Sequence, residues 1–200
     1  MLFLSVNLNS ATHTVTNGND AGAGSLREIV ANANSGDTII FADTVNYITL
    51  TSGVIRITKE LTIDGGNDTI RKITIDANNK SRIFYISDVN IPPNVHITVT
   101  INNLAFTRGY ANSAGDNWDG GAIYSWGVLT TINCNFIQNF ADVAPGGAVY
   151  ALGSDFIAIN CNFIQNYNKT NVGGAIYANC RGDGLILINC NFYENSSGLF

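Results

Sequence analysis

The sequence is poor in charge. Only 12% of its 200 residues are Asp, Glu, Lys or Arg, and the net charge is −5. The ten Lys and Arg residues form no cluster, which sequence-independent binding of nucleic acid would need. We therefore expect no nucleic-acid partner. Solubility must come from amides and hydroxyls instead, and the chain does contain 28 Asn.

Long hydrophobic runs are absent as well. No apolar run approaches the roughly 20 residues that span a bilayer, so we expect no transmembrane segment in this chain. The start, MLFLSVNLNSA, is apolar but lacks a basic n-region. Residues 1–11 therefore fit a remnant of a signal peptide, with the mature protein beginning near Thr12.

Paired cysteine spacings and histidines are scarce. The four cysteines include no C-x-x-C pair of the kind that zinc sites use. Three of them recur at one repeat position: Cys134, Cys161 and Cys190. We expect these three to be small buried hydrophobes, while a disulfide within their column, or one through Cys180, stays open. The two histidines, His13 and His96, are interpreted as strand or loop residues rather than catalytic bases.

What the sequence does have is an internal repeat. GGA(I/V)Y begins at Gly120, Gly146 and Gly173, and NCNF recurs with it, about every 27 residues. Self-similarity at 20 to 50 residues indicates stacked supersecondary units. Within one unit the alternation puts Ile132, Cys134 and Phe136 on one side of a strand. No helical periodicity appears between the repeats, so each unit fits a coil of a parallel β-helix.

Stacking such coils about 4.8 Å apart places like residues above like. The expected ladders are Cys134, Cys161 and Cys190 with Phe136, Phe163 and Phe192 inside, and Asn139, Asn166 and Asn195 at a turn. The Gly-Gly pairs would supply backbone angles that a side chain forbids.

A single helix is predicted over about 25–34. Its apolar face carries Leu26, Ile29, Val30 and Ala33. Ser25 and Glu28 form a capping-box pattern. We therefore divide the chain into an N-terminal cap over 12–45, with the helix preceding a first strand DTIIF, and β-helix coils over 46–200.

The regular repeats begin near residue 97, and their motifs carry a family resemblance. GGA(I/V) alternates with F-x-x-N, as FIQN at Phe136, FIQN at Phe163 and FYEN at Phe192. This alternation resembles the repeats of chlamydial polymorphic outer membrane proteins and of adhesin-like surface proteins of methanogenic archaea. The segment containing SLREIV resembles the C-S-L-R-E-A motif that opens such proteins, with Gly24 in place of Cys and Ile29 in place of Ala.

The resemblance implies a right-handed parallel β-helix of the all-β class, and the repeat length predicts roughly six coils. It further implies an extracellular or cell-surface location, usually within a longer protein, and a role in adhesion and display rather than catalysis. It supplies no catalytic residues to carry over.

Binding candidates come from the same repeat. Tyr124, Tyr150 and Tyr177 follow the Gly-Gly motif and should form an outward column, with Trp126 near one end. Such a column suits a host or neighbouring-cell glycan or a surface protein. The alternative is that these tyrosines only cover the coil surface beneath loops.

An enzyme is the main rival function, because parallel β-helices also carry polysaccharide lyases and hydrolases. Asp116 and Asp119, with Asp142 one coil later, are the nearest carboxylate candidates, and we interpret them as turn residues. The repeated coils hold only Lys169 and Arg181 as bases. A third alternative is a structural stalk that self-associates end to end or through a strand edge.

The sequence gives little reason to expect a cofactor. Asp64 and the Asp116–Asp119 loop offer oxygen ligands, so Ca²⁺ is the one metal considered, but the nonapeptide repeat of calcium β-rolls is absent. Arg181–Asp183 spells an integrin-type tripeptide, which chance and turn formation explain. Three N-x-S/T sequons are consistent with surface loops: Asn67, Asn168 and Asn195.

Overall fold

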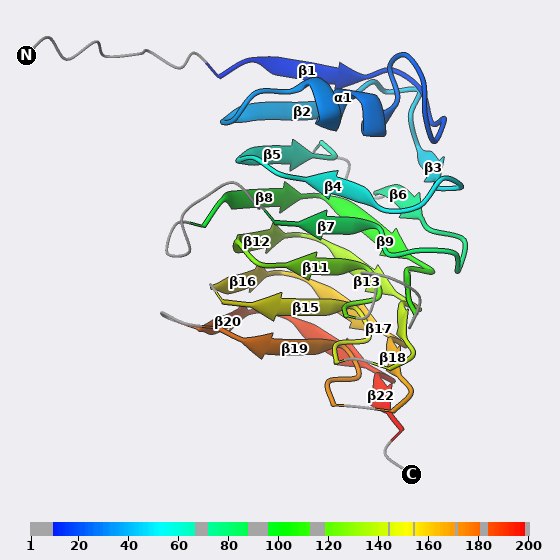
Figure 1. The fold of residues 1–200 in the computed structure, drawn as a ribbon, viewed down its shortest axis with the longest axis vertical. Helices are drawn as coiled ribbons and strands as arrows, with labels where there is room; N and C mark the ends of the chain where they lie inside the picture. The colour runs from blue at the N-terminus through cyan, green and yellow to red at the C-terminus, as the bar shows by residue number, and fades with distance from the viewer. Residues whose placement is uncertain are drawn as a thin grey trace, which may run out of the picture.

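The computed structural model describes residues 10–66, 72–87, 96–112, 119–143, 145–153, 155–170, 172–180 and 184–198. These residues are nearly all in β-structure, as parallel strands stacked into a β-solenoid of about six turns. The chain runs from the N-terminal coil at the top of Figure 1 to the C-terminal coil at the bottom. The predicted all-β parallel solenoid is confirmed.

Four sheets run along the stack. Sheet A contains β1 (Thr12–Val15), β2 (Asp37–Phe41), β5 (Leu61–Asp64), β8 (Thr98–Asn102), β12 (Val128–Ile132), β16 (Phe156–Ile159) and β20 (Leu185–Ile188). Sheet B contains β3 (Tyr47–Thr49), β6 (Ile73–Asp76), β9 (Leu104–Thr107), β13 (Asn135–Ile137), β17 (Asn162–Ile164) and β21 (Asn191–Tyr193). Sheet C contains β4 (Ile55–Ile57), β7 (Phe84–Ile86), β11 (Ile123–Ser125), β15 (Val149–Leu152) and β19 (Ile176–Asn179). Sheet D contains β10 (Tyr110–Ala111), β14 (Phe140–Ala141), β18 (Tyr167–Asn168) and β22 (Ser196–Ser197).

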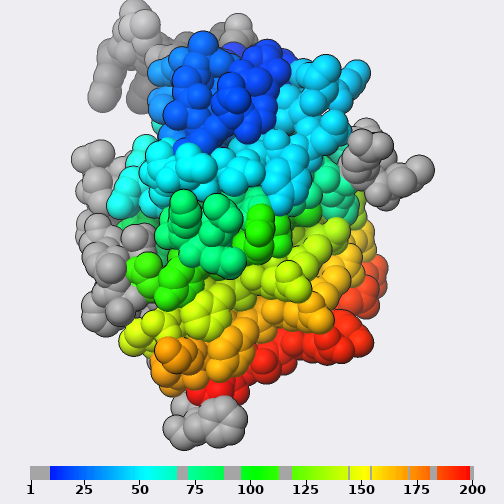
Figure 2. All heavy atoms as spheres, turned by 90° about the vertical axis from the view of Figure 1, so that its right-hand side faces the viewer, coloured from blue at the N-terminus to red at the C-terminus, as the bar shows by residue number. Residues whose placement is uncertain are grey.

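Each regular coil visits the sheets in the order A, B, D and C. The chain passes, for example, through β12, β13, β14 and β15 before it re-enters sheet A at β16. The coils are visible in Figure 2 as successive colour bands from blue to red. Residues one repeat apart therefore lie on neighbouring strands.

The corner between sheets A and B corrects the predicted strand. Asn133 lies between β12 and β13 with a left-handed backbone, φ 52°, and this breaks the period-2 alternation. As a result Cys134 and Phe136 point inward and are fully buried, whereas Ile132 is only half-buried. The prediction that all three share one side was wrong for Ile132. Asn is among the residues that tolerate this backbone region best.

The two glycines of each Gly-Gly pair have different roles. Gly146 has φ 81°, which a side chain would strain. Gly147 is required by proximity, since a Cβ there would stand 2.0 Å from the carbonyl oxygen of Gly174 on the next coil. The second glycine therefore allows adjacent coils to approach each other closely.

The inner ladders follow the predicted register. Phe136 pairs with Phe163, and Phe163 with Phe192, and their ring centroids are 4.8 Å and 4.9 Å apart. Phe106 extends the stack towards the N-terminus at 5.1 Å from Phe136. The rings fill the interior without polar atoms that need hydrogen bonds.

The helix α1 (Leu26–Asn32) falls within the predicted span, and its inward face includes the buried Leu26 and Val30. Ser25 is its N-cap and accepts a hydrogen bond from the backbone N of Glu28. The Glu28 carboxylate accepts from the Gly24 N–H rather than from the N-cap itself, at 2.7 Å. The predicted capping box is thus half formed.

One strand of the cap was missed. β1 precedes α1 and pairs in parallel with β2, so the helix does not come before the first strand. The sequence THTV is short, and its Thr and His residues gave little hydrophobic signal. β1 is the first strand of sheet A, and α1 contacts both β1 and β4 (Figure 1).

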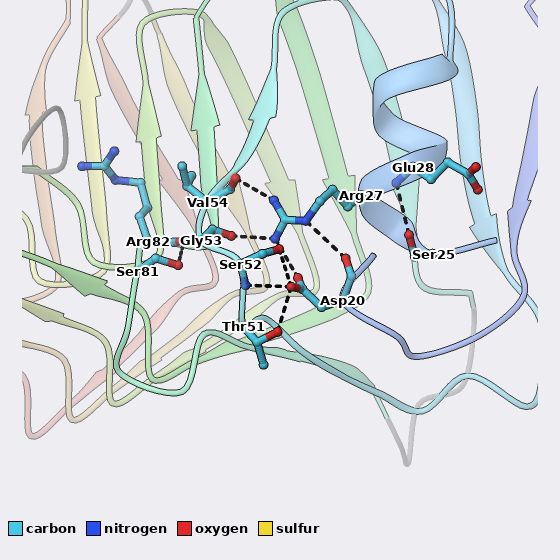
Figure 3. Close-up of polar contacts among 10 residues, drawn as sticks. All are labelled: Asp20, Ser25, Arg27, Glu28, Thr51, Ser52, Gly53, Val54, Ser81 and Arg82. Carbon is cyan, nitrogen blue, oxygen red and sulfur yellow. Dashed lines mark hydrogen bonds and ion pairs between the residues drawn. The ribbon is translucent and has the colours of Figure 1, made fainter. Parts of the chain in front are cut away.

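Arg27 of α1 ties the cap to the first coils (Figure 3). Its guanidinium donates to the carbonyl oxygens of Gly53 at 2.6 Å and Val54 at 2.8 Å, and to the Asp20 carboxylate at 2.7 Å. The other Asp20 oxygen accepts from the Ser52 N–H at 2.7 Å. Burial opposes ionisation of Asp20, but the hydrogen bonds from Ser52 and Arg27 outweigh it and lower the pKa of this carboxyl.

Candidate functional site

An outward column of tyrosines runs along sheet C. Tyr124, Tyr150 and Tyr177 lie in register on β11, β15 and β19, with ring centroids 5.5 Å and 5.2 Å apart. Tyr85 on β7 extends the stack, with its centroid 4.8 Å from that of Tyr124. The structure therefore brings the three predicted tyrosines together and adds a fourth. We call these four residues the tyrosine column.

The rings of the column are half-buried and nearly parallel. Their inward neighbours, such as Ile123 and Val149, are fully buried, which confirms the alternation that directs the tyrosines outward. Because neighbouring rings cover one another's faces, the column presents mainly ring edges and hydroxyl groups to solvent.

Trp126 lies two residues beyond Tyr124, and 45% of its surface is exposed. A Cβ on Gly153 would stand 3.6 Å from the Trp126 indole and 3.7 Å from the His96 imidazole. Trp126 and His96 therefore both lie close to Gly153, near the corner between sheets C and A. Trp118, the other tryptophan of the sequence, lies outside the described residues.

Arginines lie against the N-terminal end of the tyrosine column. The Cζ atom of Arg56 is 4.7 Å from the ring centroid of Tyr85. Arg82 is fully buried, with Cζ 5.7 Å from the Tyr85 centroid and 5.3 Å from that of Tyr124. Burial raises the pKa of Tyr124, and the neighbouring Tyr85 adds to that rise. Asp119 lies near enough to interact with Arg82, but burial outweighs this attraction and raises the pKa of the Asp119 carboxyl.

A second outward aromatic column lies on sheet D and was not predicted. Tyr110, Phe140 and Tyr167 stack with centroids 5.2 Å and 5.4 Å apart. The next strand carries Ser196 in the same register, so the aromatic series stops there. The strands of sheet D are two residues long, and no periodicity signal reveals strands that short.

The asparagine ladder is structural. Asn139 donates its Nδ2 to the Oδ1 of Asn166 at 2.9 Å, and Asn166 donates in the same way to Asn195 at 2.9 Å. Asn166 is fully buried, and its Nδ2 also reaches the carbonyl oxygen of Phe136 at 2.9 Å. These side chains serve coil-to-coil bonding rather than a ligand.

The structure corrects the interpretation of one sequon, that of Asn168, as a surface site. Asn168 is fully buried, and the Asn195 amide donates to the Phe163 carbonyl oxygen at 2.7 Å. The burial of Asn168 leaves it inaccessible for glycosylation in the folded state, whereas Asn195 is partly exposed and uses its amide in a hydrogen bond. Asn67 lies outside the described residues, as do Arg181 and Asp183 of the integrin-type tripeptide.

The cysteines are all free thiols, and the repeated three form the expected column. Cys134 and Cys161 are fully buried and Cys190 is partly buried. Each Sγ contacts a carbonyl oxygen of the preceding coil, as from Cys134 to Ile101 at 3.4 Å. Burial raises the pKa of the Cys134 thiol, which keeps it protonated and unreactive.

Two of the carboxylates considered as metal or catalytic candidates, Asp142 and Asp64, have local partners. Asp142 pairs with Lys169 at 2.9 Å, and Asp64 accepts from the Gly66 N–H at 2.9 Å and the Asn103 Nδ2 at 2.8 Å. Across the described ranges, no group of three or more His, Cys, Asp or Glu side chains is placed to hold a metal ion. Asp116 falls outside those ranges, so its spacing from Asp119 is not defined.

These features define a parallel β-solenoid with two outward aromatic columns and internally bonded ladders. No protein-family model matches the chain, and a search of curated proteins returns no relative. Within the described part of the chain, no helix has the length and apolar character needed to cross a bilayer.

Proposed function

We propose that this chain is a non-enzymatic, adhesin-like β-solenoid of the cell surface or extracellular space, which binds a carbohydrate or protein partner through the tyrosine column. The outward stack of Tyr85, Tyr124, Tyr150 and Tyr177 is the observation that carries the proposal. The alternation of GGA(I/V) and F-x-x-N supports it through the resemblance to adhesin-like repeats.

Each successive coil adds one tyrosine to the column, so the same aromatic side chain recurs from coil to coil. Each tyrosine presents a ring edge and a hydroxyl at a spacing of about 5 Å. A linear glycan or an extended peptide lying along the solenoid would meet these contacts repeatedly, so that weak individual contacts add up. Trp126, with its exposed indole, supplies a ring surface beside the column for stacking on a sugar.

Glycan-array binding tests the proposal, with Tyr150→Ala as the main variant. Loss of a central aromatic contact should weaken binding by about 2 kcal/mol, roughly 30-fold. Tyr150→Phe keeps the ring stack and removes only the hydroxyl. Any loss of affinity in this variant therefore measures the contribution of the hydroxyl. Phe140→Ala removes a ring from the other outward column and is the matched control. Equal losses in Tyr150→Ala and Phe140→Ala would contradict a binding role of the tyrosine column.

A structural stalk is favoured by one separate observation. The last described coil exposes apolar side chains: Leu185, Leu187, Ile188, Phe192 and Tyr193. A hollow of about 360 Å³ lies among Ile176, Leu185 and Phe192. End-to-end association through this surface predicts a mass that rises with concentration in analytical ultracentrifugation and falls back to the monomer in Leu187→Lys.

A polysaccharide lyase or hydrolase stays the alternative enzyme proposal. Asp119, with its raised pKa beside Arg82 and Tyr124, is its best-placed group. Glycoside hydrolysis needs a second positioned carboxylate, and Asp142 is already paired with Lys169. Release of reducing or unsaturated sugar ends from polyuronates would favour the enzyme over the adhesin.

A further inference from the structure

Arg82 is the one fully buried cation described in the structure, and its hydrogen-bonding capacity is only partly used. Its Nε donates to the main-chain oxygens of Asp119 at 2.7 Å and Gly120 at 2.9 Å. Among the described residues, neither Nη1 nor Nη2 has a hydrogen-bond partner. In Figure 3 the guanidinium points away from the Asp20–Arg27 cluster, so it takes no part in fastening the cap.

An arginine in this state is costly to the fold. Desolvation lowers the pKa of Arg82 to about 10, so the side chain is still charged at neutral pH. The rings of Tyr85 and Tyr124 attract the cation, yet they offer no carboxylate or carbonyl acceptor to the two free nitrogens. Buried charges normally have their hydrogen bonds satisfied, so the unused pair requires an explanation.

The geometry of the unused groups specifies their partner. The two Nη atoms of a guanidinium form a planar fork that matches the two oxygens of a carboxylate. Asp119 lies near enough to interact electrostatically, but its carboxylate forms a hydrogen bond with neither Nη atom. A carboxylate supplied by a ligand would satisfy both nitrogens at once.

We propose that Arg82 binds the carboxylate of an acidic saccharide whose ring lies at the Tyr85–Tyr124 end of the tyrosine column. This inference rests on the proposed function and assigns it a ligand class, a uronic-acid sugar. A sugar is favoured over an acidic peptide because the guanidinium adjoins stacked aromatic rings, whose edges and hydroxyls suit a rigid polyhydroxylated ring. Since Arg82 has no exposed surface, binding requires the side chains packed around it to make room, and the low polarity there would strengthen the ion pair with the carboxylate.

The direct test compares glucuronate with glucose, which differ only in the carboxylate. Isothermal titration of the whole chain should show binding of glucuronate and not of glucose at the same concentration. Arg82→Gln should weaken glucuronate binding on the order of tenfold or more, and Arg82→Lys should fall between because it keeps the charge without the fork. Equal binding of both sugars, or undiminished glucuronate binding by Arg82→Gln, would overturn the proposal.

Two further measurements test the charge requirement and the preference for a sugar. Asp119→Asn preserves the main-chain oxygen that Arg82 uses and removes a nearby negative charge, so it should bind glucuronate several-fold more tightly. Unchanged or weaker binding by a folded Asp119→Asn variant would count against an anion at this position. An N-acetylglutamate response equal to that of glucuronate would show that the site selects any carboxylate, which overturns the saccharide assignment.

Tyr150→Ala separates this inference from the proposed function. A chain that binds neutral glycans through Tyr150 and ignores glucuronate retains the proposed function and loses the inference. A chain that binds glucuronate through Arg82 but shows no loss in Tyr150→Ala confines recognition to the N-terminal end of the column.

Discussion

The N-terminal and C-terminal coils of the solenoid are held together by different chemistry. Up to residue 112 adjacent coils are joined by unique contacts of charged side chains, such as Arg27 with the Gly53 carbonyl oxygen and Asp76 with Arg108. From residue 119 onward repeated neutral ladders, such as Asn139–Asn166–Asn195, join the coils alongside the Asp142–Lys169 ion pair. An ion pair is complete once its two partners meet. An asparagine both donates and accepts, so its ladder passes unchanged from coil to coil.

Breaking the neutral ladder should have the largest effect. Asn166→Ala removes the amide that joins Asn139, Asn195 and the Phe136 carbonyl, and it leaves the buried Asn139 N–H without its acceptor. We expect a loss of about 4 kcal/mol in the free energy of unfolding. Urea denaturation followed by circular dichroism measures it.

Asn162→Ala is the matched control in the same coil. Its Nδ2 donates to Asn135 Oδ1 at 2.8 Å on the outer side, where water replaces a lost bond. We expect a loss below about 1 kcal/mol there. Similar losses at the two positions would show that the inner asparagines contribute no more than the outer ones.

The charged contacts of the N-terminal coils should give a smaller and pH-dependent effect. Asp76 is fully buried and accepts from Arg108 Nε at 2.9 Å and from the Tyr47 hydroxyl. Asp76→Asn should cost about 2 kcal/mol, below the value for a fully buried pair because Arg108 is partly exposed.

The sign of the pH effect follows from the direction of the shift. Burial alone would raise the pKa of Asp76, but the hydrogen bonds from Arg108 and Tyr47 outweigh it and lower the pKa. A lowered folded pKa stabilises the fold above about pH 4, the unfolded value, and this stabilisation disappears as the pH falls further. Hydrogen exchange should therefore show that acid reduces protection in residues 10–112 more than in 119–198. An equal reduction in both regions would remove the distinction between them.

The same contrast decides what the sequence could predict. Repeat spacing placed the columns of Phe136 and Asn139 correctly, because stacked coils convert a period in sequence into a column in space. The left-handed corner at Asn133 was missed, since uninterrupted alternation gives no sign of it. Tyr85 escaped notice because no Gly-Gly motif precedes it.

Arg82 is a residue of the candidate site whose position could not be predicted from the sequence. Nothing in SRIFY marks an arginine as buried, and its contacts with Asp119 and Gly120 join residues more than 35 positions apart. Its burial follows from the path of an irregular coil, not from a repeated pattern. The sequence therefore predicted the regular coils. Arg82, by contrast, lies in the irregular coil just before the regular repeats begin.

The outer amide ladder offers the smallest and most discriminating test of the neutral region. Gln138 has φ 54°, a left-handed backbone, and its Nε2 donates to Gln165 Oε1 at 3.1 Å in an exposed position. Gln138→Ala keeps the backbone strain and loses the bond, so it should destabilise by about 0.5 kcal/mol. Gln138→Gly also loses the bond but relieves the strain, so thermal unfolding should place it at or above the wild type. If glycine destabilises more than alanine, the cost of the more flexible backbone or the lost contacts of Cβ outweigh the relief of strain, and strain at this corner is small.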